Sequence, residues 1–196
     1  MSLMNYAEFL RAETLSQQQL LAWGKQTLVA DAPGTIPSLP LPPMLMFDRI
    51  IAIEHAGRRG AIVAEQDIHL DAWYFLCHFG NDPVQPGCLG VDAIWQLLGM
   101  YCALRGAVGS GRALGCKEVD FFGQIRPHDG VVRYAVEVRR YSQMQGGAVV
   151  IGDGTVRVDG EAIYRVKDAK VGIYPGIQYA DYPAASLNSK GGVLNK

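Results

Sequence analysis

The chain has 196 residues, of which 49% are hydrophobic, 19% charged and 9% aromatic. This composition is that of a globular domain and excludes an intrinsically disordered chain or a coiled coil. The 18 basic and 19 acidic residues give a formal net charge of −1, so no overall basic character indicates a nucleic-acid partner.

Cysteine usage and the apolar segments bear on the compartment. The four cysteines contain no C-x-x-C pair, so they lack a zinc signature, and we expect them to be reduced in a cytoplasmic protein (Cys77, Cys88, Cys102 and Cys116). The first residues, MSLMNYAEFLRAE, carry charges where the apolar core of a signal peptide would lie. The most apolar stretch, 88–108, is interrupted by charged and polar residues, so we expect no membrane span.

The N-terminal part of the chain predicts short helices followed by an irregular arm. Ser16 and Gln19 form a capping-box pattern ahead of LLAWGKQTL. Residues 31–43 hold five prolines, which are incompatible with a regular helix or a central strand. We therefore expect this segment to be an extended arm on the surface.

The middle of the chain predicts a strand pair and then a long helix. Residues 47–54 and 60–68 have the texture of two strands joined by a turn, and AWYFLCHF (72–79) fits a single helical turn. From residue 88, the apolar residues Val91, Ile94, Trp95, Leu98 and Tyr101 follow helical spacing. Nearly every face of this helix is apolar, so it should be buried on most sides.

The remainder predicts long antiparallel strands over residues 112–125, 131–143, 147–160 and 161–174, with a tight turn at Asp159-Gly160. One buried helix with four or five such strands predicts an α+β hot dog fold, in which the sheet curls around the helix. A Rossmann fold is disfavoured because the strands are consecutive and GSGRALG lacks the required glycine spacing. We expect one domain over 1–174, including the arm, and a loosely ordered tail over 175–196.

The stretch HFGNDPVQPGCLGVD, residues 78–92, carries the candidate chemistry. Pro86 suits the first turn of a helix, and the N–H groups that follow it can stabilise an oxyanion at the positive end of the helix dipole. His78 can act as a general base, and Asp92 lies about one turn into the helix. The pattern alone equally allows a structural histidine, an aspartate that only offsets the helix dipole, and a Pro-Gly pair that only marks a turn.

This stretch resembles the active-site segment of the bacterial 3-hydroxydecanoyl-[acyl-carrier-protein] dehydratase/isomerase family. PPMLMFDRI before it, and GRALGCKEVDFFGQIRP and VDGEAIYRVKDAKVGIY after it, extend the resemblance over about residues 42–174. The resemblance implies a homodimer of hot dog subunits with active sites at the dimer interface, acting in fatty acid biosynthesis. The departures are Asn81-Asp82 in place of the family's glycine-aspartate, and a poor match over residues 1–40 and beyond 175.

The family's roles match individual residues of this chain. His78 matches the catalytic histidine, and Asp92 matches the acid that the other subunit donates and that stays protonated in an apolar pocket. Gly87 and Cys88 match the backbone donors to the thioester carbonyl, and Val84 matches the carbonyl that orients the histidine. The implied reaction is loss of water from a 3-hydroxyacyl thioester to a trans-2-enoyl product, with isomerisation to the cis-3 product, and it needs no metal or other cofactor.

Three alternative functions are compatible with the sequence, and the proposed substrate carrier would need a docking surface. A hot dog thioesterase, a non-catalytic acyl-binding module, and a dehydratase without isomerase activity that serves a polyketide or polyunsaturated-fatty-acid pathway are the alternatives. The acidic acyl carrier protein would need a local basic patch on a nearly neutral protein. Four cations on the last strands are candidates for this docking surface: Arg139, Arg140, Lys167 and Lys170. Their alternative role is to protect a strand edge from aggregation.

Overall fold

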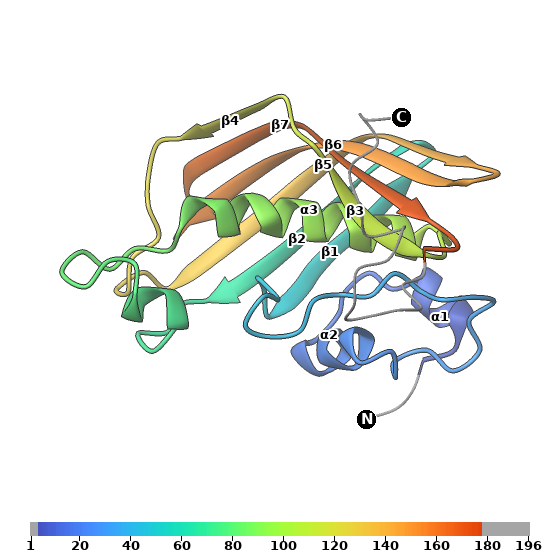
Figure 1. Ribbon diagram of the computed structural model, residues 1–196, viewed down its shortest axis with the longest axis horizontal. Coiled ribbons are helices and arrows are strands. Elements are labelled where there is room, and N and C mark those ends of the chain that lie inside the picture. Colours follow the sequence, from blue (N-terminus) through green and yellow to red (C-terminus); the bar gives the residue numbers. More distant parts are fainter. Residues whose placement is uncertain (1–3, 178–196) are drawn as a thin grey trace.

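A computed structural model describes residues 4–177 as one antiparallel sheet wrapped around a single long helix, α3 (Gly87–Leu104) (Figure 1). The seven strands are β1 (Arg49–Ala56), β2 (Arg59–Asp67), β3 (Ser110–Gly115), β4 (Glu118–Phe121), β5 (Val131–Met144), β6 (Gly147–Val158) and β7 (Glu161–Tyr174). Their order in the sheet is β1-β2-β5-β6-β7-β3, with β4 also paired to β7. The predicted α+β hot dog architecture is confirmed.

Helix α3 is the centre of the hydrophobic core. Its apolar side chains point in nearly all directions, and 67% of its residues are buried, as expected of a core helix even though its length and composition would allow a membrane span. Two glycines let helix and sheet approach closely. A Cβ atom on Gly90 would lie 2.6 Å from the Tyr164 ring, and one on Gly154 of β6 would lie 2.8 Å from Ile94.

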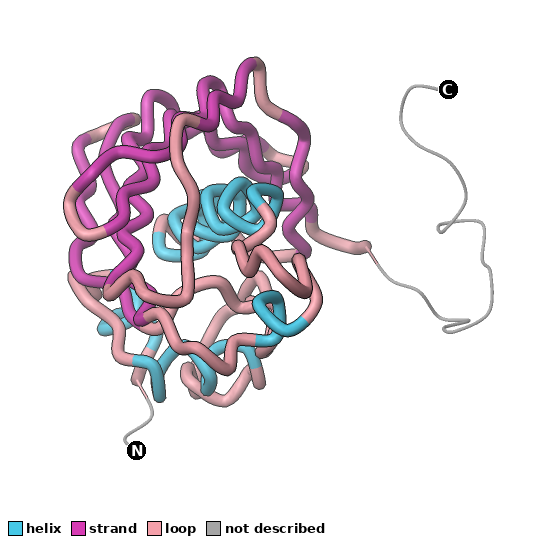
Figure 2. Tube along the Cα trace, turned by 90° about the vertical axis from the view of Figure 1, so that its left-hand side faces the viewer, coloured by secondary structure: helices cyan, strands magenta, loops and turns pink. Residues whose placement is uncertain are grey.

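The N-terminal segment closes the open side of the sheet, as the view in Figure 2 shows. It contains α1 (Tyr6–Leu10) and α2 (Gln17–Gly24), and the predicted capping box between Ser16 and Gln19 is present. The proline-rich arm that follows has no regular structure, as predicted, and it is tied to α2 by the indole of Trp23, which donates to the Pro37 carbonyl at 2.8 Å. Leu15 bridges to Ile50 and thereby covers the outer edge of β1.

The prediction of one long strand over residues 112–125 is wrong. The chain instead forms the short strands β3 and β4, both paired with β7, with a break at residues 116–117. Gly115 adopts a φ of 123°, a backbone angle that residues other than glycine rarely adopt. The register of the pairing with β7 shifts between Ala113 and Gly115. This bulge ends β3 early and lets β4 start again on the same neighbour.

The tight turn between β6 and β7 is confirmed. Asp159 and Gly160 both have positive φ angles, of 47° and 97°, as a two-residue hairpin turn requires. The prediction for the tail falls, from residue 178 onward, outside the described residues.

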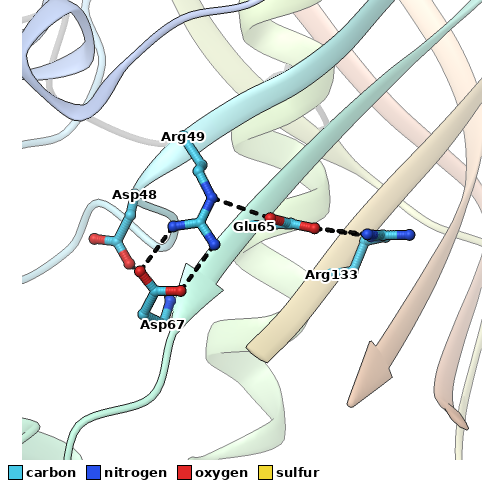
Figure 3. Close-up of polar contacts among 5 residues, drawn as sticks. All are labelled: Asp48, Arg49, Glu65, Asp67 and Arg133. Atoms are coloured by element: carbon cyan, nitrogen blue, oxygen red, sulfur yellow. Dashed lines mark hydrogen bonds and ion pairs between the residues drawn. The ribbon is translucent and has the colours of Figure 1, made fainter. Parts of the chain in front are cut away.

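An ion-pair network on the outer face of the sheet joins β1, β2 and β5 (Figure 3). Arg49 makes two hydrogen bonds to Asp67, at 2.7 and 2.8 Å, and one to Glu65 at 3.0 Å. Arg133 completes the row by donating to the other oxygen of Glu65 at 2.7 Å. The guanidinium of Arg133, with that of Arg49, lowers the pKa of the Glu65 carboxyl, and Arg49 lowers that of Asp67.

We predict that this network stabilises the fold only above the acid range. Both carboxyl pKa values are lower in the folded chain than in the unfolded chain, where they are about 4. The network therefore adds to the free energy of unfolding above about pH 4, and this contribution is lost as the pH falls through the pKa values of the folded chain. Arg49→Met should lower the free energy of unfolding by about 1 kcal/mol at pH 7, since the pairs are partly exposed. Urea unfolding of both proteins at pH 7 and below pH 4 measures this, and a pH-independent difference would contradict it.

Candidate functional site

His78 lies in a loop that is closed by its own backbone. The loop joins the 3-10 helix η1 (Trp73–Leu76) to α3. The His78 N–H donates to the Tyr74 carbonyl at 2.8 Å, and its carbonyl accepts from the Val84 N–H, also at 2.8 Å. Phe79 and Asp82 exchange two further backbone hydrogen bonds of 3.0 and 3.1 Å. The backbone on either side of the histidine is therefore fixed before any substrate binds.

The imidazole of His78 is oriented by a backbone carbonyl. Its Nδ1 lies 2.9 Å from the carbonyl oxygen of Val84. A carbonyl can only accept, so Nδ1 carries the proton and the Nε2 of the neutral ring keeps its lone pair. The ring is half-buried, and the exposed Phe79 ring lies beside it at a centroid distance of 3.9 Å. This is the tautomer that a general base requires.

A contact between two loops braces the segment from outside. The guanidinium of Arg126, in the β4–β5 connection, pairs with the Asp82 carboxylate and donates to the Pro83 carbonyl at 3.2 Å. The backbone N–H of Arg126 in turn donates to the Asp129 carboxylate at 2.6 Å. The first pair of contacts fastens the His78 loop to the β4–β5 connection, and the second orders that connection.

The N-terminus of α3 begins just after this loop. Pro86 is the N-cap and has no side-chain hydrogen bond to the helix. The N–H groups of Gly87 and Cys88 are the first of the helix and have no acceptor within it. A Cβ atom on Gly87 would lie 2.7 Å from the Phe121 ring, so this position needs glycine for the close approach of β4. Cys88 is exposed, which leaves this end of the helix open to solvent.

Asp92 lies further along α3 and is held by Gln96, one turn later. The Gln96 Nε2 donates to Asp92 Oδ2 at 2.6 Å and to the Met44 carbonyl at 2.8 Å. The Gln96 Oε1 accepts from the Met46 N–H at 3.2 Å. The amide is thus fixed at both ends by the segment before β1, and it sets the position of the carboxyl group.

Asp92 also lines a cavity of about 270 Å³ that runs along α3. Its walls come from the arm, from one face of α3 and from β3 and β7; they include Leu39, Trp95, Gly99, Met100, Ala113 and Val171. A larger cavity of about 420 Å³ lies in the N-terminal segment, and none of the candidate residues lines it. The cavity beside Asp92 therefore adjoins one of the two candidate catalytic residues.

The two candidate catalytic side chains do not meet within one chain. The contacts of His78 are with Tyr74, Phe79 and Val84, whereas the carboxyl group of Asp92 is bonded to Gln96. Within residues 4–177, His78 is therefore held by Val84, just before the start of α3. The carboxyl group of Asp92 makes its hydrogen bond elsewhere, to Gln96. Those residues also include no group of three or more His, Cys, Asp or Glu side chains that could hold a metal ion.

The four predicted docking cations lie on the exposed faces of β5 and β7. Arg139 is paired with both Asp153 and Asp168, and Lys167 donates to Glu118 at 2.9 Å. Arg139 and Arg140 are both exposed, although adjacent strand residues normally face opposite sides, because the register shifts between Val138 and Arg140. Two of the four cations are thus already neutralised.

Three residues around the site were not found from the sequence. Gln96 follows Asp92 at helical i, i+4 spacing, and that spacing was a usable signal. Gln85 and Arg126 carry no comparable signal, because their partners are 19 and 44 residues away along the chain. Gln96 bonds directly to the predicted Asp92, whereas Arg126 bonds to the loop that carries His78 and Gln85 directly follows Val84 in the chain.

The hot dog fold, together with a family match, indicates a dehydratase, a hydro-lyase. The FabA-like domain family matches residues 39–167, about two thirds of the chain, and the chain belongs to this family. The match includes the His78 loop, α3 and the first six strands of the sheet.

Solved structures with partial similarity include two dehydratases. The Dehydratase Heterocomplex ApeI:P from Xenorhabdus doucetiae has 12% identity and a TM-score of 0.49, covering 71% of this chain and 88% of that one. The MaoC-like dehydratase from Rhodospirillum rubrum has 18% identity and a TM-score of 0.42, covering 63% of this chain and 95% of that one. The E. coli PaaI protein from the phenylacetic acid degradation operon has 14% identity and a TM-score of 0.43, covering 62% of this chain and 79% of that one.

Proposed function

We propose that this dehydratase removes water from 3-hydroxyacyl thioesters on acyl carrier protein, giving trans-2-enoyl thioesters in fatty acid biosynthesis, and that it isomerises them to cis-3 products. The observation that carries the proposal is the 2.9 Å contact between His78 Nδ1 and the Val84 carbonyl, immediately before the free N-terminus of α3. It provides a general base and an oxyanion site on consecutive segments of one chain.

The reaction follows from these groups. The N–H groups of Gly87 and Cys88 donate hydrogen bonds to the thioester carbonyl, whose oxygen gains negative charge when C2 loses a proton. His78 Nε2 takes that proton, and Asp92 of the partner subunit gives one to the departing 3-hydroxyl, which leaves as water. Isomerisation uses the same histidine to move a proton between C4 and C2 of the enoyl product.

A homodimer with shared sites is supported by the free edge of β3. The arrangement would bring His78 of one subunit to Asp92 of the other. Strand β3 pairs with β7 on one side and, among the described residues, with no strand on the other. Leu114, Phe121 and Phe122 are each about half exposed, at 47%, 53% and 54%. An apolar surface beside an unpaired edge is typical of a surface that a second copy covers.

The cavity beside Asp92 fits the acyl chain of such a substrate. Its volume is about 270 Å³, and most of the residues that line it are apolar, as the acyl chain of a substrate requires. The Asp92 carboxyl marks one wall, so the chain beyond C3 would continue along α3.

The reaction class is tested with 3-hydroxyacyl thioesters of several chain lengths. Absorbance of the enoyl product measures dehydration, free thiol measures hydrolysis, and separation of the products by double-bond position measures isomerisation. Thiol release without enoyl product would indicate a thioesterase and overturn the proposal. Dehydration without a cis-3 product would leave a dehydratase that lacks the isomerase step.

We predict that His78→Ala or Asp92→Asn lowers turnover by about 10²–10⁴-fold, because each removes a group that moves a proton in the transition state. Circular dichroism and thermal unfolding should show an intact fold. His128→Ala is the matched control, since the side chain of His128 is 82% exposed and pairs only with its neighbour Asp129. Near wild-type turnover in either variant would remove that residue from the mechanism.

We also predict that a mixture of the two inactive variants regains activity. A hybrid dimer has one site with both mutations and one with His78 and Asp92 intact, so up to about a quarter of wild-type activity should return after random exchange. Mass spectrometry of isotope-labelled subunits verifies the exchange. Complete exchange without recovery would refute the shared site.

Docking of acyl carrier protein is supported by a pair of cations on the outer face of the sheet. Arg140 aligns with Ile151 of β6, which aligns with Lys170 of β7, so the two cations lie in one row, two strands or roughly 10 Å apart. Neither has a carboxylate partner within the described residues, and the nearest bond of Arg140 is to the Ser142 hydroxyl at 3.2 Å. We propose this pair as the centre of the docking surface, with Arg139 and Lys167 at its margin.

We predict that Arg140→Glu with Lys170→Glu raises KM for carrier-protein substrates and weakens its salt dependence. Turnover of short soluble thioesters should be unchanged, because the groups at His78 and Asp92 are untouched. Arg133→Glu, a single charge reversal on the same face but within the Glu65 pair, serves as a control for position. Equal losses on both kinds of substrate would assign the two cations to the fold instead.

A further inference from the structure

Gln85 is a buried polar residue at the junction of the two halves of the site. Its side chain is 1% exposed, and it is the one polar residue of the described chain in the buried core. It directly follows Val84, whose carbonyl orients His78, and directly precedes Pro86, the N-cap of α3. Its N–H donates to the carbonyl of the buried Ile125 at 3.0 Å. Any displacement of Gln85 would therefore move both the Val84 carbonyl and the oxyanion site.

The side chain of Gln85 belongs to a cluster of amides and phenols inside the sheet. Its Nε2 lies 3.4 Å from Gln66 Oε1 on β2, which also accepts from the Tyr134 hydroxyl of β5 at 2.9 Å. The Gln66 Nε2 in turn lies 3.4 Å from the hydroxyl of Tyr74. Burial raises the pKa values of both phenols, so they remain neutral hydrogen-bonding groups.

This cluster holds His78 from both sides along the chain. Tyr74 provides the carbonyl that accepts from the His78 N–H, and Gln85 is bonded covalently to Val84, which holds the imidazole. Gln66 joins the two, because it contacts the Tyr74 hydroxyl and the Gln85 amide. The histidine is thus fixed to two strands of the sheet through one set of buried polar groups.

One atom of the cluster is left without a partner. The Oε1 of Gln85 is buried and accepts no hydrogen bond from the described residues. A buried acceptor without a donor destabilises a fold, and an apolar side chain of the same length would avoid this. An unfavourable group is characteristic of a functional position, where geometry is held at the expense of stability.

We propose that Gln85 is a positioning residue that keeps His78 in the Nδ1-protonated form and aligns it with the N-terminus of α3. The catalytic part of this inference rests on the proposed dehydratase function. The positioning part concerns the His78–Val84 contact alone.

The test is Gln85→Met, which keeps the length of the side chain and removes both polar atoms. Turnover should fall about tenfold or more with KM little changed, since a misplaced catalytic group lowers kcat rather than binding. Nitrogen NMR of the histidine ring should show loss of the single Nδ1–H tautomer. The Tm should stay at or above that of the wild type, because the unsatisfied acceptor is gone.

Two further variants complete the test. Tyr134→Phe removes the hydroxyl at the far end of the cluster, and it should lower turnover and disturb the His78 tautomer less than Gln85→Met does. The double variant should have a turnover no lower than that of Gln85→Met, because both changes act on the same cluster. Tyr141→Phe is the matched control, because it removes a phenol on β5 that bonds only to Gln143, at 3.2 Å. It should leave turnover and tautomer unchanged.

The outcomes separate the two claims. An unchanged His78 tautomer, or unchanged turnover, in folded Gln85→Met overturns the positioning role. If Gln85→Met does not fold, the same criteria apply to Tyr134→Phe. A wild-type protein that dehydrates no thioester would instead overturn the proposed function, while the NMR measurement would still decide whether Gln85 positions His78.

Discussion

The enclosure of α3 is the constraint on which the rest of the structure depends. A helix that is apolar on nearly every face can be stable in water only if other elements surround it. Here the sheet covers most of its circumference and the N-terminal segment closes the remaining side. Most backbone groups of the helix bond to one another, so only its N-terminal end can offer unpaired N–H donors. The open end, at Gly87 and Cys88, is the one that follows the His78 loop.

Close packing at that end transmits the rigidity of the sheet to the site. The Phe121 ring lies against Gly87, the Tyr164 ring lies against Gly90, and the two rings meet edge to face at 4.8 Å. The first turn of α3 therefore cannot shift without displacing β4 and β7. A stabilising site for a developing oxyanion gains from such fixed donors, because they need no rearrangement when charge appears.

The sequence was sufficient for features that depend on local pattern. Helical spacing located α3, the capping pattern located α2, and Asp159-Gly160 located a hairpin turn. The split between β3 and β4 was missed because a β-like composition continues through it, and only the positive φ of Gly115 ends the strand. His78 and Asp92 were assigned through a resemblance that extends along most of the chain. The spacing of Gln96 to Asp92 was a usable signal for one of the contacts that hold them. The contacts of Gln96 with Met46 and of Gln85 with Gln66 could not be predicted, because the partners are 50 and 19 residues apart along the chain.

Two sets of polar groups near the core of this apolar protein follow the two candidate catalytic residues. One set, around Gln85, fixes the histidine; the other, around Gln96, fixes the carboxyl group of Asp92. The contacts of each set lie within one chain, and neither set requires the other. Under the proposed function, association of two subunits would join two half-sites that are already formed, with little reorganisation. Buried polar groups destabilise a monomer, but under the proposed function they would place the base and the acid before the subunits meet, as catalysis at an interface requires.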